Sequence, residues 1–133
     1  MSATQFDDNW SDYTLDEVAD TTILVPFTFD TTTIQALANY DIYFYGKYKP
    51  TDSDTATVFT CSTISTTVTI IDAPSGKVQA TVANTATQPL ALKNAPTKLY
   101  TEWKIKLKAG GTLQSVLGGR GVINIHGTVI GSL

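Results

Sequence analysis

The segment Lys98–Lys108, with the sequence KLYTEWKIKLK, constrains the fold of this chain more than any other stretch. Apolar and charged side chains alternate along it. Successive side chains of a β-strand point to opposite faces, whereas a helix would spread the lysines around its circumference. We therefore predict a long central strand whose apolar face carries Leu99, Trp103, Ile105 and Leu107.

The other face of this strand carries tyrosine, glutamate and lysine side chains. Alternate lysines on a strand are typical of a face in water or of a protected sheet edge. We interpret this face as solvated or as facing a neighbouring subunit. Its residues are Tyr100, Glu102, Lys104, Lys106 and Lys108.

Further segments alternate in the same way, and turn residues separate them. The clearest is a hairpin, because Asp72–Gly76 places Asp, Pro and Gly where a turn favours each of them, and Lys77–Val82 returns as a strand. Pro26 cannot donate a ladder hydrogen bond, so its strand should lie at a sheet edge or a bulge. The other expected strands are Leu15–Ala19, Thr21–Phe29, Asp41–Lys49, Ala56–Cys61, Thr66–Ile71, a brief segment at Leu113–Leu117, and Val122–Ile130.

Seven or eight short strands with one long crossover at Ala83–Pro96 predict an all-β fold, a two-layer antiparallel immunoglobulin-like β-sandwich. A chain of 133 residues fits one domain. We assign residues 13–133 to the sandwich and residues 1–12 to an N-terminal arm. Cys61 is the only cysteine, so an intrachain disulfide is impossible and the fold must hold by packing.

Large aromatic residues mark the start of the chain. Phe6, Trp10 and Tyr13 are interleaved with acidic residues in a pattern that has neither strand nor helix periodicity. Apolar surface of this size prefers a partner. Two interpretations stay open: the arm packs back onto its own sandwich, or it docks on a neighbouring subunit.

Composition argues against several classes of function. A net charge of -3 and a pI near 4.8 are unlike the basic face of a nucleic-acid-binding protein, and they do not favour an anionic membrane surface. No apolar run has the length of a transmembrane helix, and the acidic N-terminus lacks the pattern of a signal peptide. We expect no contact with nucleic acid or membrane.

Residues for catalysis are scarce. His126 is the only histidine and falls on the polar face of the last strand, where a surface position is expected. Cys61 lies between Thr60 and Ser62 without an activating neighbour, which favours a small buried side chain. We therefore predict that the protein is not an enzyme and has no catalytic residues or cofactor.

Two loops carry weak ligand-like patterns. Asp52 and Asp54 lack the remaining ligand spacing of a calcium loop, so a solvated loop is the preferred interpretation and no metal site is predicted. The Gly118–Gly121 segment has no following Lys-Ser/Thr and no helix, which indicates a flexible hairpin or a bulge instead of a phosphate loop.

Two stretches resemble a known family. They are Ile70–Val78, with the sequence IIDAPSGKV, and Leu99–Ile105, with the sequence LYTEWKI, followed by a Gly turn at Gly110–Thr112. Together they resemble the immunoglobulin-like N-terminal domain of phage baseplate upper proteins, and related modules occur in tail and head-fibre proteins of tailed phages. The likeness covers residues 41–130.

The resemblance implies a bacteriophage virion structural protein, such as a tail, baseplate or neck adaptor, a capsid decoration or a head-fibre component. Such a module is made in the host bacterial cytoplasm, is located in the virion, contacts other virion proteins and forms a homo-oligomer. The alternative is a carbohydrate-binding module that stacks sugars on surface tyrosines, although cross-strand packing or a subunit interface explains these rings equally well. The expected interface residues are Phe6, Trp10, Tyr13, Tyr43, Tyr45 and Tyr100.

Overall fold

The computed structural model describes residues 12–32, 34, 36–93 and 95–127. Short helical turns connect some of the strands: η1 (Leu37–Asn39), η2 (Ala73–Ser75), α2 (Asn84–Thr87) and η3 (Gln88–Leu90). The strands in this part of the chain are β1 (Tyr13–Val18), β2 (Ile23–Thr28), β3 (Tyr40–Lys47), β4 (Phe59–Ser62), β5 (Val68–Asp72), β6 (Lys77–Val82), β7 (Thr97–Leu107) and β8 (Gln114–His126).

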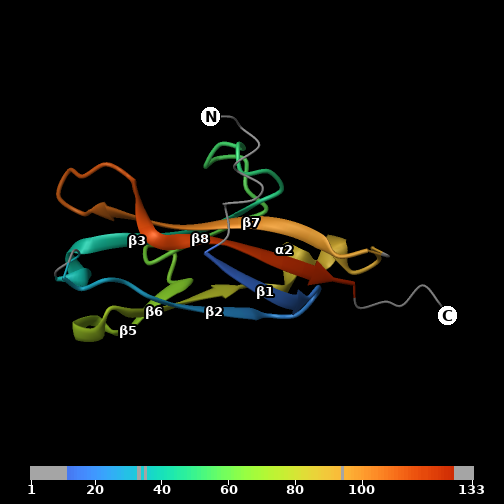
Figure 1. Ribbon diagram of the computed structural model, residues 1–133, viewed down its shortest axis with the longest axis horizontal. Coiled ribbons are helices and arrows are strands. Elements are labelled where there is room, and N and C mark those ends of the chain that lie inside the picture. The colour runs from blue at the N-terminus through green and yellow to red at the C-terminus, as the bar shows by residue number, and fades with distance from the viewer. Residues whose placement is uncertain (1–11, 33, 35, 94, 128–133) are drawn as a thin grey trace.

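The strands form two facing sheets (Figure 1). One has five strands in the order β1-β8-β7-β3-β4, and the other has three in the order β2-β6-β5. This is the strand arrangement of an immunoglobulin-like sandwich in which β4 extends the sheet of β8, β7 and β3. The predicted all-β, immunoglobulin-like sandwich is therefore confirmed.

One strand pair departs from the expected antiparallel pattern. β1 runs parallel to β8, with Tyr13 opposite Gly121 and Val18 opposite His126. The chain passes from β1 into β2 of the other sheet, so no hairpin connects β1 to its neighbour or sets its direction. All other pairs among the described strands are antiparallel.

The predicted central strand is confirmed as β7, which pairs with β3 on one side and β8 on the other. Leu99 and Trp103 are fully buried, and Ile105 is buried as well. The prediction was wrong for Leu107, which is 44% exposed. Leu107 is the last residue of β7, and its carbonyl accepts the turn hydrogen bond from Gly111, so it already belongs to the start of the β7–β8 hairpin.

Aromatic rings join the two sheets at the centre of the core. Trp103 of β7 stacks on Phe27 of β2, with centroids 5.2 Å apart and an interplanar angle of 17°. Phe44 of β3 lies 4.5 Å from Trp103, and Phe29 meets it edge-on at 6.3 Å. In antibody domains a disulfide links the two strands that correspond to β2 and β7. Here a ring stack occupies that place.

Each edge of the five-stranded sheet carries a ring that lies over a glycine of the next strand. Tyr13 of β1 covers Gly121, and Phe59 of β4 covers Gly46. A Cβ atom built on either glycine would overlap the ring, at 2.0 Å from Tyr13 and 2.3 Å from Phe59. The two glycines therefore let the edge rings close the sides of the wider sheet.

Several predicted boundaries change. The two segments predicted at Leu113–Leu117 and Val122–Ile130 form one strand, β8, which begins at Gln114, continues through Gly118–Gly121 with a bulge and ends at His126. Residues 128–130 lie outside the described part of the chain. The bulge lies opposite β7, where Glu102 faces Arg120 but Lys104 faces Ser115. β3 ends at Lys47 and β4 begins only at Phe59, so the connection between them is longer than expected.

Two local predictions are confirmed. The turn after β5 is built as expected, with Gly76 at φ 75°, a left-handed backbone that favours glycine. Pro26 lies on β2, an edge strand of the three-stranded sheet.

Truncation of Trp103 tests the importance of the ring stack. We expect Trp103→Ala to lower the free energy of unfolding by about 3–5 kcal/mol, because the substitution removes a fully buried indole and leaves a cavity between the sheets. Urea denaturation followed by circular dichroism measures the change. Leu92→Ala is the control, since Leu92 is 73% exposed. An unchanged midpoint for Trp103→Ala would contradict the assignment of the stack as the centre of the core.

Candidate protein interface

The face of the five-stranded sheet that points away from the three-stranded sheet is called the outer face here. Alternation along each strand determines which side chains it presents. They include Tyr43, Tyr45 and Lys47 of β3, Tyr100, Glu102 and Lys104 of β7, and Arg120 of β8.

The β3–β4 connection, residues 48–58, folds over this face. Figure 1 shows this green segment on the side of β3 and β7 that is turned away from β2, β5 and β6. Lys47 Nζ donates to Asp54 Oδ1 at 2.6 Å and to the carbonyl of Asp52 at 2.9 Å. Lys104 Nζ donates to Asp54 Oδ2 at 2.9 Å. One carboxylate therefore ties the loop to two strands of the sheet.

The ion pairs continue across the sheet. Lys104 Nζ lies 4.0 Å from Glu102 Oε1, and Arg120 Nε lies 3.4 Å from Glu102 Oε2. Positive and negative charges thus alternate from Lys47 through Asp54, Lys104 and Glu102 to Arg120. Lys47 is 6% exposed and Glu102 is 5% exposed, so their charges depend on these partners.

The network corrects two predictions. The Lys/Glu face of β7 is not an open solvated face at Glu102 and Lys104, because the loop and the neighbouring strands cover them. The loop around Asp54 is not simply solvated either. Burial raises the pKa of Asp54, but the hydrogen bonds from Lys47 and Lys104 outweigh that effect and leave the pKa below its ordinary value.

Tyr45 lies within the network. It is 5% exposed, and the Nζ atoms of Lys47 and Lys104 each lie 5.8 Å from its ring centroid, within the range of a cation–π contact. Burial raises its pKa to about 12, with Asp54 adding to the effect. The Tyr43 ring lies beside it, 5.9 Å away and tilted by only 4°. Burial and then Asp41 raise the pKa of Tyr43.

The structure brings Tyr43, Tyr45 and Tyr100 onto one face, but Tyr45, which the sequence predicted as a surface ring, is buried there. Tyr100 is half-buried and lies opposite Lys47 in the β3–β7 register. Tyr13 is separate from them, because its ring faces inward over Gly121. Phe6 and Trp10 lie outside the described residues.

The Tyr13 side chain points into the sandwich, where its hydroxyl meets Thr101. Its hydroxyl is 2.8 Å from Thr101 Oγ1, and burial raises its pKa to about 12. The indole Nε1 of Trp103 is buried without a hydrogen-bond partner among the described residues. The structure therefore leaves Tyr43 and Tyr100 as the predicted interface residues that are both on the outer face and partly accessible.

Sequence reasoning did not assign Lys47, Asp54, Glu102 or Arg120 to the candidate site. The alternation of β3 does place Lys47 on the same face as Tyr43 and Tyr45, so the sequence alone could have assigned Lys47 to the site. No periodicity in residues 48–58 indicates that the loop returns over the sheet, so Asp54 could not have been found in the same way.

Other candidate groups lie apart from this surface. His126 Nε2 is 3.3 Å from Asp16 Oδ1, at an exposed position on β8, as predicted for a surface histidine. Cys61 is buried, as predicted, and burial raises the pKa of its thiol to about 11. Among the described residues there is no group of three or more His, Cys, Asp or Glu side chains placed to hold a metal. No helix in the same residues has the length and apolarity needed to cross a membrane.

Comparison with known proteins adds little. No family model matches the chain, and no curated protein matches it either. Among solved structures, one similar chain is described as "The three dimensional structure of NK cell receptor Nkp44, a triggering partner in natural cytotoxicity". It shares 12% identity, with a TM-score of 0.45, over 84% of this chain and 95% of the receptor chain. A likeness at this level carries no argument about function.

Asp54→Asn tests the network. The substitution removes the shared carboxylate and leaves the buried Lys47 ammonium with fewer acceptors, so we expect the free energy of unfolding to fall by about 2 kcal/mol. The decrease should be fully present at pH 7, above the unfolded pKa of Asp54, and should shrink as the pH falls through its lowered folded pKa, because protonation then removes the charge in the wild type as well. Asp52→Asn in the same loop is the control and should change stability by less than about 0.5 kcal/mol. Equal losses for the two variants would contradict the shared-carboxylate arrangement.

Tyr13 gives a test at high pH. A folded pKa of about 12 against 10.0 means that its contribution to stability is fully present below pH 10 and is lost as the pH rises toward 12. Between pH 8 and pH 11 the wild type should therefore lose about 1 kcal/mol relative to Tyr13→Phe, measured by urea denaturation. Tyr48→Phe, at a position that is 52% exposed, controls for removal of a hydroxyl. If the difference in stability between the wild type and Tyr13→Phe did not change with pH, the pKa of Tyr13 would be the same in the folded and the unfolded chain.

Proposed function

We propose that the protein is a bacteriophage virion structural protein that acts through protein–protein contacts, as a tail, baseplate or neck adaptor, a capsid decoration or a head-fibre component. The sequence resemblance over residues 41–130 suggests the class. The structural observation that carries the proposal is the outer face, where fixed ion pairs surround the partly accessible rings of Tyr43 and Tyr100.

The outer face suits binding without large rearrangement. Asp54 holds Lys47 and Lys104, and Tyr45 is locked beneath them, so few rotamers remain to be ordered when a partner arrives. Tyrosine and arginine are enriched at protein interfaces, because they combine apolar area with polar tips. Tyr43, Tyr100 and the 42% exposed side chain of Arg120 fit that composition.

Three of the four edge strands, β4, β2 and β5, disfavour pairing with a strand of another chain. β4 has only four residues, β2 carries Pro26, and β5 is interrupted by a bulge between Ile70 and Asp72. Short, proline-containing and bulged edges resist the addition of a strand from another chain. A partner, whether a virion protein or another copy of this chain, is therefore expected to dock on a face or an end of the sandwich in preference to these three edges.

The alternative, a carbohydrate-binding module, depends on exposed flat rings. Tyr45 is 5% exposed and cannot offer a ring face to a sugar, so a platform would rest on Tyr43 and Tyr100 alone. The structure thus supports a protein partner better than a stacked sugar.

Binding to purified virion structural proteins of tailed phages tests the proposal. Each protein is titrated onto the immobilised full chain, and we expect at least one tail, baseplate, neck or capsid protein to bind. The double substitution Tyr43→Ser with Tyr100→Ser should weaken that binding by about tenfold or more, because it removes both rings from the surface. Leu92→Ser, at an exposed apolar side chain in the crossover between β6 and β7, is the control.

The outcomes separate the two functions. Absence of binding to every virion protein tested would overturn the structural role. A glycan array run with the same variants covers the alternative: sugar binding that is lost in the double variant would replace the proposal with a carbohydrate-binding function.

A further inference from the structure

One end of the sandwich gathers three connections, and this region is called the loop end here. The β2–β3 connection, the turn at η2 and the β7–β8 hairpin meet there, at the left of Figure 1. Phe29 N–H donates to the carbonyl of Gly76 at 2.8 Å, and Lys108 N–H donates to the carbonyl of Asn39 at 3.0 Å. The outer face lies on a different side of the molecule.

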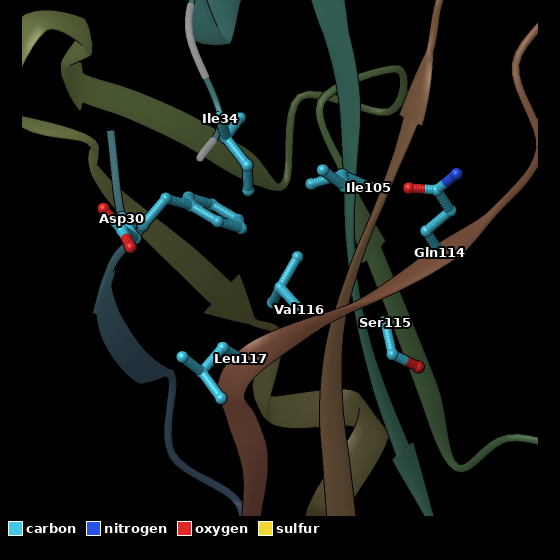
Figure 2. Close-up of a pocket in the computed structure, with 8 residues that line it drawn as sticks. Asp30, Ile34, Ile105, Gln114, Ser115, Val116 and Leu117 are labelled. Carbon is cyan, nitrogen blue, oxygen red and sulfur yellow. The ribbon is translucent and has the colours of Figure 1, made fainter. Parts of the chain in front are cut away.

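A small apolar pocket opens between the β2–β3 connection and the start of β8. Its volume is about 130 Å³. Figure 2 shows Ile34, Ile105 and Val116 pointing toward its middle, while the polar ends of Gln114 and Ser115 point away. An apolar cavity of about 150 Å³ is large enough to bind benzene, so this pocket is sized for one aliphatic or aromatic side chain.

Leu117 lies at the rim of this pocket and is 92% exposed. That is the highest exposure of any large hydrophobic residue in the described part of the chain. Leu107, at the start of the same hairpin, is 44% exposed. Each copy of the chain therefore carries an almost fully exposed leucine and, beside it, a pocket of the size of a leucine side chain. The leucine of one copy and the pocket of another are complementary.

The charges around the loop end are balanced. The described residues there include two acidic and two basic side chains, although the whole chain has a net charge of -3. The hairpin side is basic at Lys108, and the β2–β3 side carries Asp30. Two copies that meet head-on would place the hairpin of each against the β2–β3 connection of the other, so that opposite charges face one another. The four residues are Asp30, Asp72, Lys77 and Lys108.

We propose that two copies of this chain associate through the loop end around a two-fold axis, each placing Leu117 in the pocket of the other. Such a contact is isologous, because the same surface serves on both copies, and it closes at a dimer. The inference goes beyond the function proposed above, since it uses a surface separate from the outer face and names a second copy of the chain as the occupant.

Sedimentation equilibrium of the full chain, from about 1 μM to about 1 mM, tests the proposal in a range where weak dimers are detected. We expect concentration-dependent dimerisation. Leu117→Ser should raise the dissociation constant about a hundredfold, because each dimer loses two buried leucines and each accounts for about a factor of ten. Leu92→Ser is the matched control, at a leucine that is 73% exposed and lies in the crossover at the opposite end, and it should leave the constant unchanged.

A second variant tests the pocket itself. Val116→Leu narrows the pocket from within while keeping Leu117, and it should also weaken the dimer. Mixing Leu117→Ser with Val116→Leu restores one of the two contacts, since the leucine of the second variant enters the open pocket of the first. The mixture should therefore associate more tightly than either variant alone. Circular dichroism confirms that each variant is folded.

Two outcomes would overturn the inference. A monomer at every concentration rules out the dimer. Self-association that Leu117→Ser leaves unchanged would place any dimer on another surface, and the substitutions at Tyr43 and Tyr100 would then show whether it is the outer face. Neither result bears on the binding of virion proteins, so the two proposals fail independently.

Discussion

The stack of Trp103 on Phe27 is the contact on which the rest of the structure depends. It joins the two sheets at the place where antibody domains use a disulfide, and Phe44 and Phe29 complete a ring cluster around it. A buried ring cluster of this kind contributes through transfer from water and ring packing. A chain with one cysteine can therefore keep an immunoglobulin-like arrangement without any cross-link.

The same stack sets the geometry of the outer face. Once Trp103 points into the core, strand alternation directs its neighbours Glu102 and Lys104 outward. β3 does the same on the next strand, where Phe44 points inward and Tyr43 and Tyr45 point outward. The inner and outer faces of the sheet are thus two consequences of one register.

The β3–β4 loop then determines how the outer face behaves. An ammonium group as buried as Lys47 is costly unless it is paired and hydrogen-bonded, and Asp54 together with the carbonyl of Asp52 meets that need. Because Asp54 also binds Lys104, the loop is tied to two strands at once. In the sequence the lysines of this strand resemble an open charged face, but in the structure the loop covers the ion-pair network. Tyr43, Tyr100 and Arg120 stay partly accessible.

The sequence alone determined the class of fold, the central strand, the edge position of Pro26 and the Gly76 turn, because alternation and turn chemistry are local and each follows from a few neighbouring residues. It also placed Tyr43 and Tyr45 on one side of their strand. Only the tertiary structure decided the parallel β1–β8 pair, the bulge in β8, the return of Asp54 over the sheet and the pocket beside Leu117. These features join residues that are distant along the chain, and their energies come from burial and charge pairing that arise only once the two sheets have met.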